Sequence, residues 1–284
     1  MQIARNKPAK SKGLSFAANV LIVLGLILIL IPLYLTVITA LKTKSELLRN
    51  FFALPQSLYL GNFQYILSKP DYYYAIGNSL MITGCALAVM LVMLPTLSFA
   101  LSRGMKSARL FRAFYYIIIA GIFVPFQVRM LPLMKLMTRI GLMNRLGIII
   151  LYIATSTCEG TFLYVGFLAH IPQELEEAAY IDGASTNLLY WKIIYPLMLP
   201  ITATVMIKNG LWIWNDFMMP LIMLNKSAQY HTITLFQHAF KTAYTADYTL
   251  AFATFIMSIL PIMLLYVFCQ KYIIAGLTNG AVKG

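Results

Sequence analysis

The chain has 284 residues, of which 60% are hydrophobic and only 11% are charged. A soluble domain carries roughly a quarter charged residues, so this composition excludes an ordinary soluble protein and indicates surfaces that face lipid. The net charge of +13 would suit nucleic-acid binding, but the Lys and Arg residues lie in short segments between apolar runs. That distribution is typical of membrane-topology signals and of contact with anionic lipid.

The apolar runs are long enough to cross the bilayer as helices, which takes about 20 residues each. Helices are required because each unpaired backbone amide in lipid costs several kcal/mol. Unbroken runs such as residues 20–33 exclude the alternating strands of a membrane barrel. We therefore predict an all-α polytopic membrane protein, one domain over residues 1–284 with six transmembrane helices. The expected spans are about 16–39, 75–101, 112–134, 147–169, 197–224 and 249–270.

The distribution of cations predicts the orientation. Residues 1–15 carry four Lys or Arg residues and no acid, and residues 103–112 carry four more. The run after the first segment is too long for the core of a signal peptide, so we expect an uncleaved first span. Because dense cations in short loops and near the first span favour the cytoplasmic side, both termini are expected in the cytoplasm.

Two charged residues lie at the expected depth of the membrane centre, Glu159 in the fourth span and Lys208 in the fifth. A charge there costs at least about 2.5–3.5 kcal/mol, which makes such residues candidates for function. Two interpretations stay open. The residues form an ion pair that joins two helices, or they line a translocation path and contact the substrate.

The fifth span extends this polar face through Asn209, Trp212, Asn215 and Asp216. Positions four, seven and eight residues after Lys208 share one helix stripe. A sugar stacks its C–H faces on an aromatic ring and hydrogen-bonds through its hydroxyl groups, so the stripe is a candidate sugar site. The alternative for the tryptophan is an interfacial aromatic belt.

Cations also gather on the expected outer side. They are Arg129 at the outer end of the third span, with Lys42, Lys44, Arg139 and Arg145. A positive potential concentrates anions, so an acidic oligosaccharide is a second candidate substrate. A neutral oligosaccharide stays ahead of it, because Glu159 can neutralise Lys208 and Arg129 can be a simple surface cation.

The loop 172–196 differs from the others because it holds four of the nine acidic residues. We expect two short helices there, with Pro172 at the first position of one and acids near its positive end. Gly183 can end this helix, and Ser185 or Thr186 can cap the next. An ordered amphipathic helix pair on the cytoplasmic side favours the docking of a soluble partner.

Residues of this loop resemble the EAA motif of binding-protein-dependent ABC importers, in which the loop forms a coupling helix seated on a cytoplasmic ATPase. The matching residues are Glu177, Ala178, Ala179, Asp182, Gly183 and Pro196. The run from Asp182 to Ser185 resembles the carbohydrate-uptake branch, the maltose-permease type. Where that family usually has Leu before the proline, this chain has Tyr195, a change of one apolar anchor for another.

Two further stretches agree, so that the resemblance covers essentially the whole chain. Residues 214–217, followed by Pro220 and Leu221, resemble the fifth-span signature of the carbohydrate branch. The tail 271–284 resembles its carboxyl terminus, which in maltose-type members reaches between the two ATPase subunits.

The resemblance implies a permease subunit in the cytoplasmic (inner) membrane of a prokaryote. Its implied partners are a second homologous permease, two cytoplasmic ATPase subunits, an extracytoplasmic solute-binding protein and membrane lipid, with no nucleic acid. ATP and magnesium are expected on the ATPase subunits, since the chain has no phosphate-binding G-x-x-x-x-G-K motif and no metal-ligand spacing. We thus expect no enzyme activity and no cofactor in this chain.

Two other functions remain as alternatives. An ion-coupled secondary transporter would use Glu159 as its proton or cation carrier, and its uptake would be sensitive to uncouplers. An intramembrane enzyme would show turnover by the isolated chain. The EAA-like loop argues against both.

Overall fold

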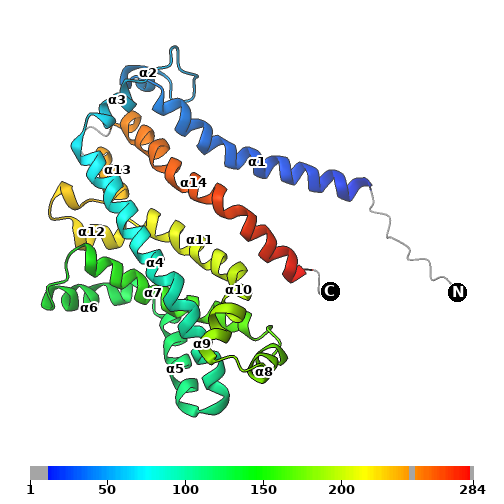
Figure 1. Ribbon diagram of the computed structural model, residues 1–284. Helices are drawn as coiled ribbons and strands as arrows, with labels where there is room; N and C mark the ends of the chain where they lie inside the picture. The colour runs from blue at the N-terminus through cyan, green and yellow to red at the C-terminus, as the bar shows by residue number, and fades with distance from the viewer. Residues whose placement is uncertain (1–11, 243–246, 282–284) are drawn as a thin grey trace. The chain divides into compact units, whose positions relative to one another are not determined.

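The computed structural model describes residues 12–242 and 247–281, and every regular element in these ranges is a helix (Figure 1). The predicted all-α fold is therefore confirmed. In chain order the helices are α1 (Lys12–Ala40), α2 (Lys44–Arg49), α3 (Gly61–Leu67), α4 (Pro70–Ser107), α5 (Arg109–Ala120), a 3₁₀ turn (Gly121–Phe123), α6 (Phe126–Arg139), α7 (Arg145–Leu168), α8 (Glu174–Ile181), α9 (Thr186–Leu189), a π-helical turn (Tyr190–Ile194), α10 (Tyr195–Leu197), α11 (Leu199–Asn215), α12 (Met218–Leu224), a 3₁₀ turn (Ala228–Tyr230), α13 (Ile233–Thr242) and α14 (Tyr248–Ala281).

The chain divides into two compact units. One holds the residues up to Ser68 together with Phe240–Met257, and the other holds Lys69–Ala239 and the residues from Ser258 onward. In the first unit, α1 exposes its large apolar side chains on every side from Val20 to Leu33. A helix that is apolar all round is stable in lipid rather than in water.

Within the first unit, a buried lysine organises the segment after α1. Lys42 is 0% exposed, and its Nζ donates to the carbonyl oxygens of Asn50 and Phe51 at 3.1 Å each. The side-chain amide of Asn62 donates to Ala40 O at 2.9 Å and to Lys42 O at 2.8 Å, where α1 leaves carbonyl groups without helical partners. The prediction that Lys42 adds to a basic outer surface is wrong, because backbone carbonyls inside the unit bind its ammonium group.

The second unit is built around α4, α7 and α11. On α4, the fully buried side chains of Ile82, Ala86, Met90 and Leu94 recur every four residues and so face one direction. On α7, Gly160 lets the two helices approach closely, since a Cβ atom there would lie 2.9 Å from Leu94 Cδ1. Apolar packing therefore joins α4 and α7, the helices that carry Arg103 and Glu159.

Local signals set the ends of these helices. Pro70 opens α4, where its fixed φ suits the first helical position. Asp71 in the first turn and Lys106 in the last turn complement the helix dipole. At the start of α7, the Asn144 side chain accepts a hydrogen bond from Gly147 N at 3.1 Å and caps the helix.

The loop after α12 is fastened to α4. The side-chain amide of Asn78 donates to the carbonyl oxygens of Gln229 and His231 at 2.9 Å each. Burial lowers the pKa of His231, and the nearby Asp71 carboxylate opposes this shift. The imidazole is therefore held closer to its neutral form than a free histidine.

Two of the expected helices are interrupted. Residues 112–134 are not one continuous helix, because Arg109–Phe123 and Phe126–Arg139 meet at 108°. The break falls at Pro125, which lacks an N–H and keeps the preceding Val124 extended, with φ −91° and ψ 108°.

The helix expected over 197–224 is also shorter than predicted. The helix Leu199–Asn215 meets the preceding segment Thr186–Leu197 at 69°, and it ends at Asn215, where Asp216 is extended. The Asp216 carboxylate then accepts a hydrogen bond from Met218 N at 3.1 Å, where α12 begins. An aspartate therefore ends one helix and starts the next.

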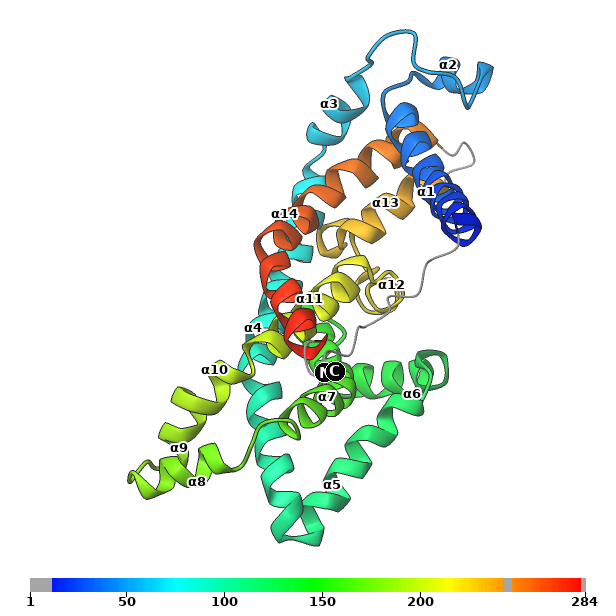
Figure 2. The ribbon, with the colours of Figure 1, turned by 90° about the vertical axis from the view of Figure 1, so that its right-hand side faces the viewer.

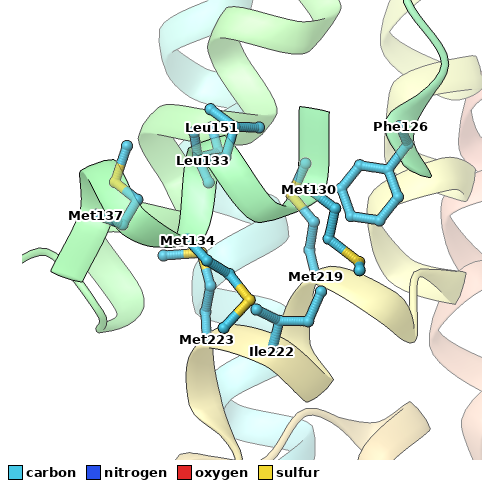
Figure 3. Close-up of a pocket in the computed structure, with 9 residues that line it drawn as sticks. All are labelled: Phe126, Met130, Leu133, Met134, Met137, Leu151, Met219, Ile222 and Met223. Carbon is cyan, nitrogen blue, oxygen red and sulfur yellow. The ribbon is translucent and has the colours of Figure 1, made fainter. Parts of the chain in front are cut away.

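Between α6 and α12 lies an interface rich in methionine (Figure 3). The side chains from the two helices point toward one another there, beside one residue of α7. The lining residues are Phe126, Met130, Leu133, Met134, Met137, Leu151, Met219, Ile222 and Met223. Methionine is flexible and fills irregular gaps, so it suits the packing of two helices at this interface.

Length and composition identify up to five membrane spans within the described residues. Three are single helices, Ala18–Ala40, Pro70–Ser107 and Arg145–Leu168, and two are the bent pairs at 108° and 69°. The sixth predicted span falls within α14, a helix of 34 residues whose part Tyr248–Leu264 is apolar. The count of six thus stays a prediction.

Candidate functional site

The charged residues expected at membrane depth meet in the second unit. Glu159 of α7 and Lys208 of α11 form an ion pair, with side chains 47% and 48% exposed respectively. They face a hollow of about 200 Å³. Its other lining residues are Thr155, Ser156, Asn209 and Trp212. The two sequence-based interpretations are therefore compatible, since the ion pair joins two helices and also lines open space.

The tryptophan of this site has a defined position. The Trp212 ring packs edge-to-face on Tyr152, with ring centroids 5.3 Å apart and planes at 80°. Tyr152 is buried and donates its hydroxyl hydrogen to Asp216 Oδ2 at 2.8 Å. An aromatic ring held beside a charged pair is an arrangement that suits a polyhydroxylated solute.

The predicted polar stripe of the fifth span divides between two roles. Lys208, Trp212 and Asn215 are exposed on α11. Asn209 is buried, and its side chain accepts from Ser156 Oγ at 2.8 Å and donates to Val205 O at 2.9 Å. Asn209 lines the hollow, but its polar atoms, like those of Asp216, are engaged by groups of α7, α11 and α12.

The loop of the EAA-like motif folds as two short helices, as expected. Gly183 follows α8 with φ +82°, a left-handed conformation that ends a helix and that other residues adopt at a cost. Ser185 caps α9 by accepting from Leu188 N at 3.3 Å. One detail differs from the prediction: α8 begins at Glu174, so Pro172 lies before the first helical position.

The end of α4 holds α8 through an ion pair that the sequence did not reveal. The Arg103 guanidinium donates from Nε to both carboxylate oxygens of Glu176, at 2.8 and 3.1 Å, and from Nη2 to Oε1. The two side chains are only 19% and 11% exposed. In both views α8 and α9 lie at the same end of α4 as the α4–α5 turn (Figures 1 and 2).

Most of the other residues of α8 are exposed. Ala179 is buried against the unit, whereas Glu177, Ala178 and Asp182 are exposed. The apolar side chains of Leu175, Tyr180 and Ile181 are also exposed, with Ile181 at 86%. We call the exposed residues Leu175, Glu177, Ala178, Tyr180, Ile181 and Asp182 the α8 face.

A π-helical turn follows α9 and leads into Pro196. Because the proline has no N–H to give to the preceding turn, the backbone there widens, and Tyr195 N bonds to Tyr190 O. The Tyr190 hydroxyl lies 2.9 Å from Thr96 Oγ1, and Tyr195 donates to Leu91 O at 3.4 Å. Both tyrosines thereby join this segment to α4.

Comparisons with known proteins identify the family to which this chain belongs. Residues 96–279 match the family described as the binding-protein-dependent transport system inner membrane component. The chain belongs to this family. The multiple sugar-binding transport system permease protein MsmG of Streptococcus mutans is 42% identical, over 94% of this chain and 97% of its own length. The probable starch degradation products transport system permease protein AmyC of Thermoanaerobacterium thermosulfurigenes is 33% identical, over 92% and 95% respectively.

A solved structure shares the fold of this permease. It is a bacterial ABC transporter involved in the import of the acidic polysaccharide alginate, with a TM-score of 0.78 and 22% identity over 94% of this chain and 99% of that chain. The family makes the permease a polytopic helical component of a prokaryotic inner membrane. Its relatives are transport permeases rather than enzymes.

The remaining predicted residues of the permease lie elsewhere. Arg129 is half-buried on α6, and its Nε has no hydrogen-bond partner among the described residues. In the tail 271–284 the backbone stays helical to Ala281, and residues 282–284 lie outside the described part, as does most of the basic segment 1–15. Within residues 12–242 and 247–281, no group of three or more His, Cys, Asp or Glu residues could hold a metal ion.

Proposed function

We propose that this permease imports a sugar or oligosaccharide in an ATP-driven transporter. It pairs with a second permease and with two cytoplasmic ATPase subunits that bind ATP and magnesium, and an extracytoplasmic binding protein delivers the solute. The proposal is supported by membership of a binding-protein-dependent family and by the sugars named for its relatives. Both termini and the loop 172–196 then face the cytoplasm.

The observation that carries the proposal is the attachment of α8 to α4 by Arg103 and Glu176. The α8 face presents apolar and acidic side chains to a partner, while the ion pair fixes the helix to a span of the membrane domain. When the ATPase subunits close and move α8, the ion pair would therefore transmit that movement directly to α4. The spans would then alternate between inward-facing and outward-facing states of different substrate affinity.

The hollow beside Trp212 is the proposed place of solute contact. It offers an aromatic ring, a carboxylate and an ammonium group within one lining. Because the Glu159 carboxylate balances the Lys208 ammonium group, the lining of the hollow carries no net positive charge that would favour an acidic solute. A neutral oligosaccharide is therefore the first candidate and a uronate-bearing one the second.

The test uses the permease purified with its partner subunits and binding protein. ATPase activity is measured with neutral and with uronate-bearing oligosaccharides, and transport is measured in vesicles. Glu177→Lys on the α8 face should leave assembly intact and abolish solute-stimulated transport, whereas the control Lys226→Glu in an exposed outer loop should not. Normal transport by Glu177→Lys would refute the coupling role, and stimulation by no saccharide would refute the substrate class.

A further inference from the structure

A second pocket lies at the end of α4, beside the start of α5 and the end of α7. Its volume is about 480 Å³. The lining residues are Ser102, Arg103, Met105, Lys106, Arg112, Val165, Leu168, Ala169, Ile171 and Gln173. We call it the basic pocket, because its lining includes three cations and no acidic residue. It is separate from the hollow beside Trp212, with which it shares no lining residue.

Only one of the three cations is neutralised. Arg103 is engaged by Glu176. Arg112 donates to the carbonyl oxygen of Met105 at 3.2 Å, which positions its guanidinium and leaves its charge unbalanced. Lys106 is exposed and makes no hydrogen bond or ion pair within the part of the chain that the structure describes. The pocket therefore presents two uncompensated positive charges in a partly enclosed space, where an anion is attracted strongly.

The helix that leads away from the basic pocket is apolar and exposed. On α5, Leu110, Phe114, Tyr116 and Ile117 have exposures of 64%, 52%, 64% and 69%. Tyr116 follows Arg112 by four residues and so lies one turn further along the same face. In a membrane protein such a surface meets acyl chains. Cations at the end of an exposed apolar helix match a ligand that has an anionic head and a hydrocarbon tail.

We propose that the basic pocket binds one anionic phospholipid. Lys106 and Arg112 would hold its phosphate, and its acyl chains would lie along α5. Ile171 and Gln173 of the lining immediately precede α8, so a bound lipid also stabilises the connection between α7 and α8. This inference needs only the membrane location shown by the family, and holds whichever solute is carried.

Native mass spectrometry and thermal unfolding of the purified full-length permease complex test the proposal. The probes are phosphatidylglycerol, zwitterionic phosphatidylcholine and inorganic phosphate. We expect phosphatidylglycerol to be retained and to raise the unfolding temperature, with little effect of the other two. The double variant Lys106→Gln, Arg112→Gln should bind phosphatidylglycerol about 30-fold more weakly, since each basic side chain near an anionic headgroup contributes roughly fivefold.

Two comparisons separate this site from general attraction to charge. The control Lys135→Gln, Lys226→Gln removes two exposed cations elsewhere in the same unit and should bind phosphatidylglycerol as the unaltered protein does. Lys106→Gln alone, which breaks no bond in the described structure, should weaken binding about fivefold without lowering the unfolding temperature in detergent alone. Equal losses in the test and control double variants, or equal stabilisation by phosphate and by phosphatidylglycerol, would overturn the proposal.

Discussion

The Arg103–Glu176 pair gives a sharp test of how α8 is held. The change is Glu176→Gln, which keeps the size of the side chain and removes its charge. Removing one partner costs about 3–5 kcal/mol in a buried pair and about 0–1 kcal/mol in an exposed one. With the side chains 19% and 11% exposed, we expect α8 to lose about 2 kcal/mol of local stability.

Hydrogen exchange of the amides in residues 174–181 measures this loss. When the helix recloses faster than its exposed amides exchange, 2 kcal/mol corresponds to about a 30-fold rise in the exchange rate. The control is Glu174→Gln, an exposed acid in the first turn of the same helix. It should raise exchange less than about fivefold, the limit of its interaction with the helix dipole.

A double-mutant cycle identifies the cause. The cycle compares the single variants Arg103→Met and Glu176→Met with the double variant that carries both changes. The double variant should recover part of the protection that either single variant loses, because neither charge is left without its partner. If Glu176→Gln raises exchange no more than Glu174→Gln, or if the single effects add, the pair does not hold α8 to α4. The route of coupling proposed above would then be refuted.

Three further predictions concern other positions. Glu159→Ala should lower the unfolding temperature of the purified protein more than the double variant Glu159→Ala, Lys208→Ala, and strictly additive effects would contradict the pairing. Gly183→Ala should cost about 1–2 kcal/mol in unfolding free energy because of its positive φ, with Gly183→Asn less harmful; equal effects would contradict the strain. Asn62→Ala should cost about 2 kcal/mol in the same assay by leaving two buried carbonyl groups unpaired, and a loss below about 0.5 kcal/mol would contradict this.

Two of the helix ends that the structure reveals have a signal in the sequence. Pro125 stood in the middle of an apolar run, and the backbone preference of a residue before proline was enough to expect an extended Val124. The length of the apolar run predicts one helix over 112–134, whereas two helices meet there at 108°. In the same way, Asp216 was assigned to a polar stripe although aspartate commonly caps the next helix.

What the sequence by itself determined depends on local physics. The length of an apolar run sets whether it spans a membrane, and glycine, serine and proline set turns and caps through their own backbone preferences, as at Gly183 and Ser185. Tertiary structure alone decided the pairs that join distant segments. Arg103 and Glu176 are 73 residues apart, and the Asn78 amide donates to a carbonyl oxygen 151 residues further along the chain. Such contacts depend on which helix faces meet, and that is settled by packing of the whole unit rather than by any one segment.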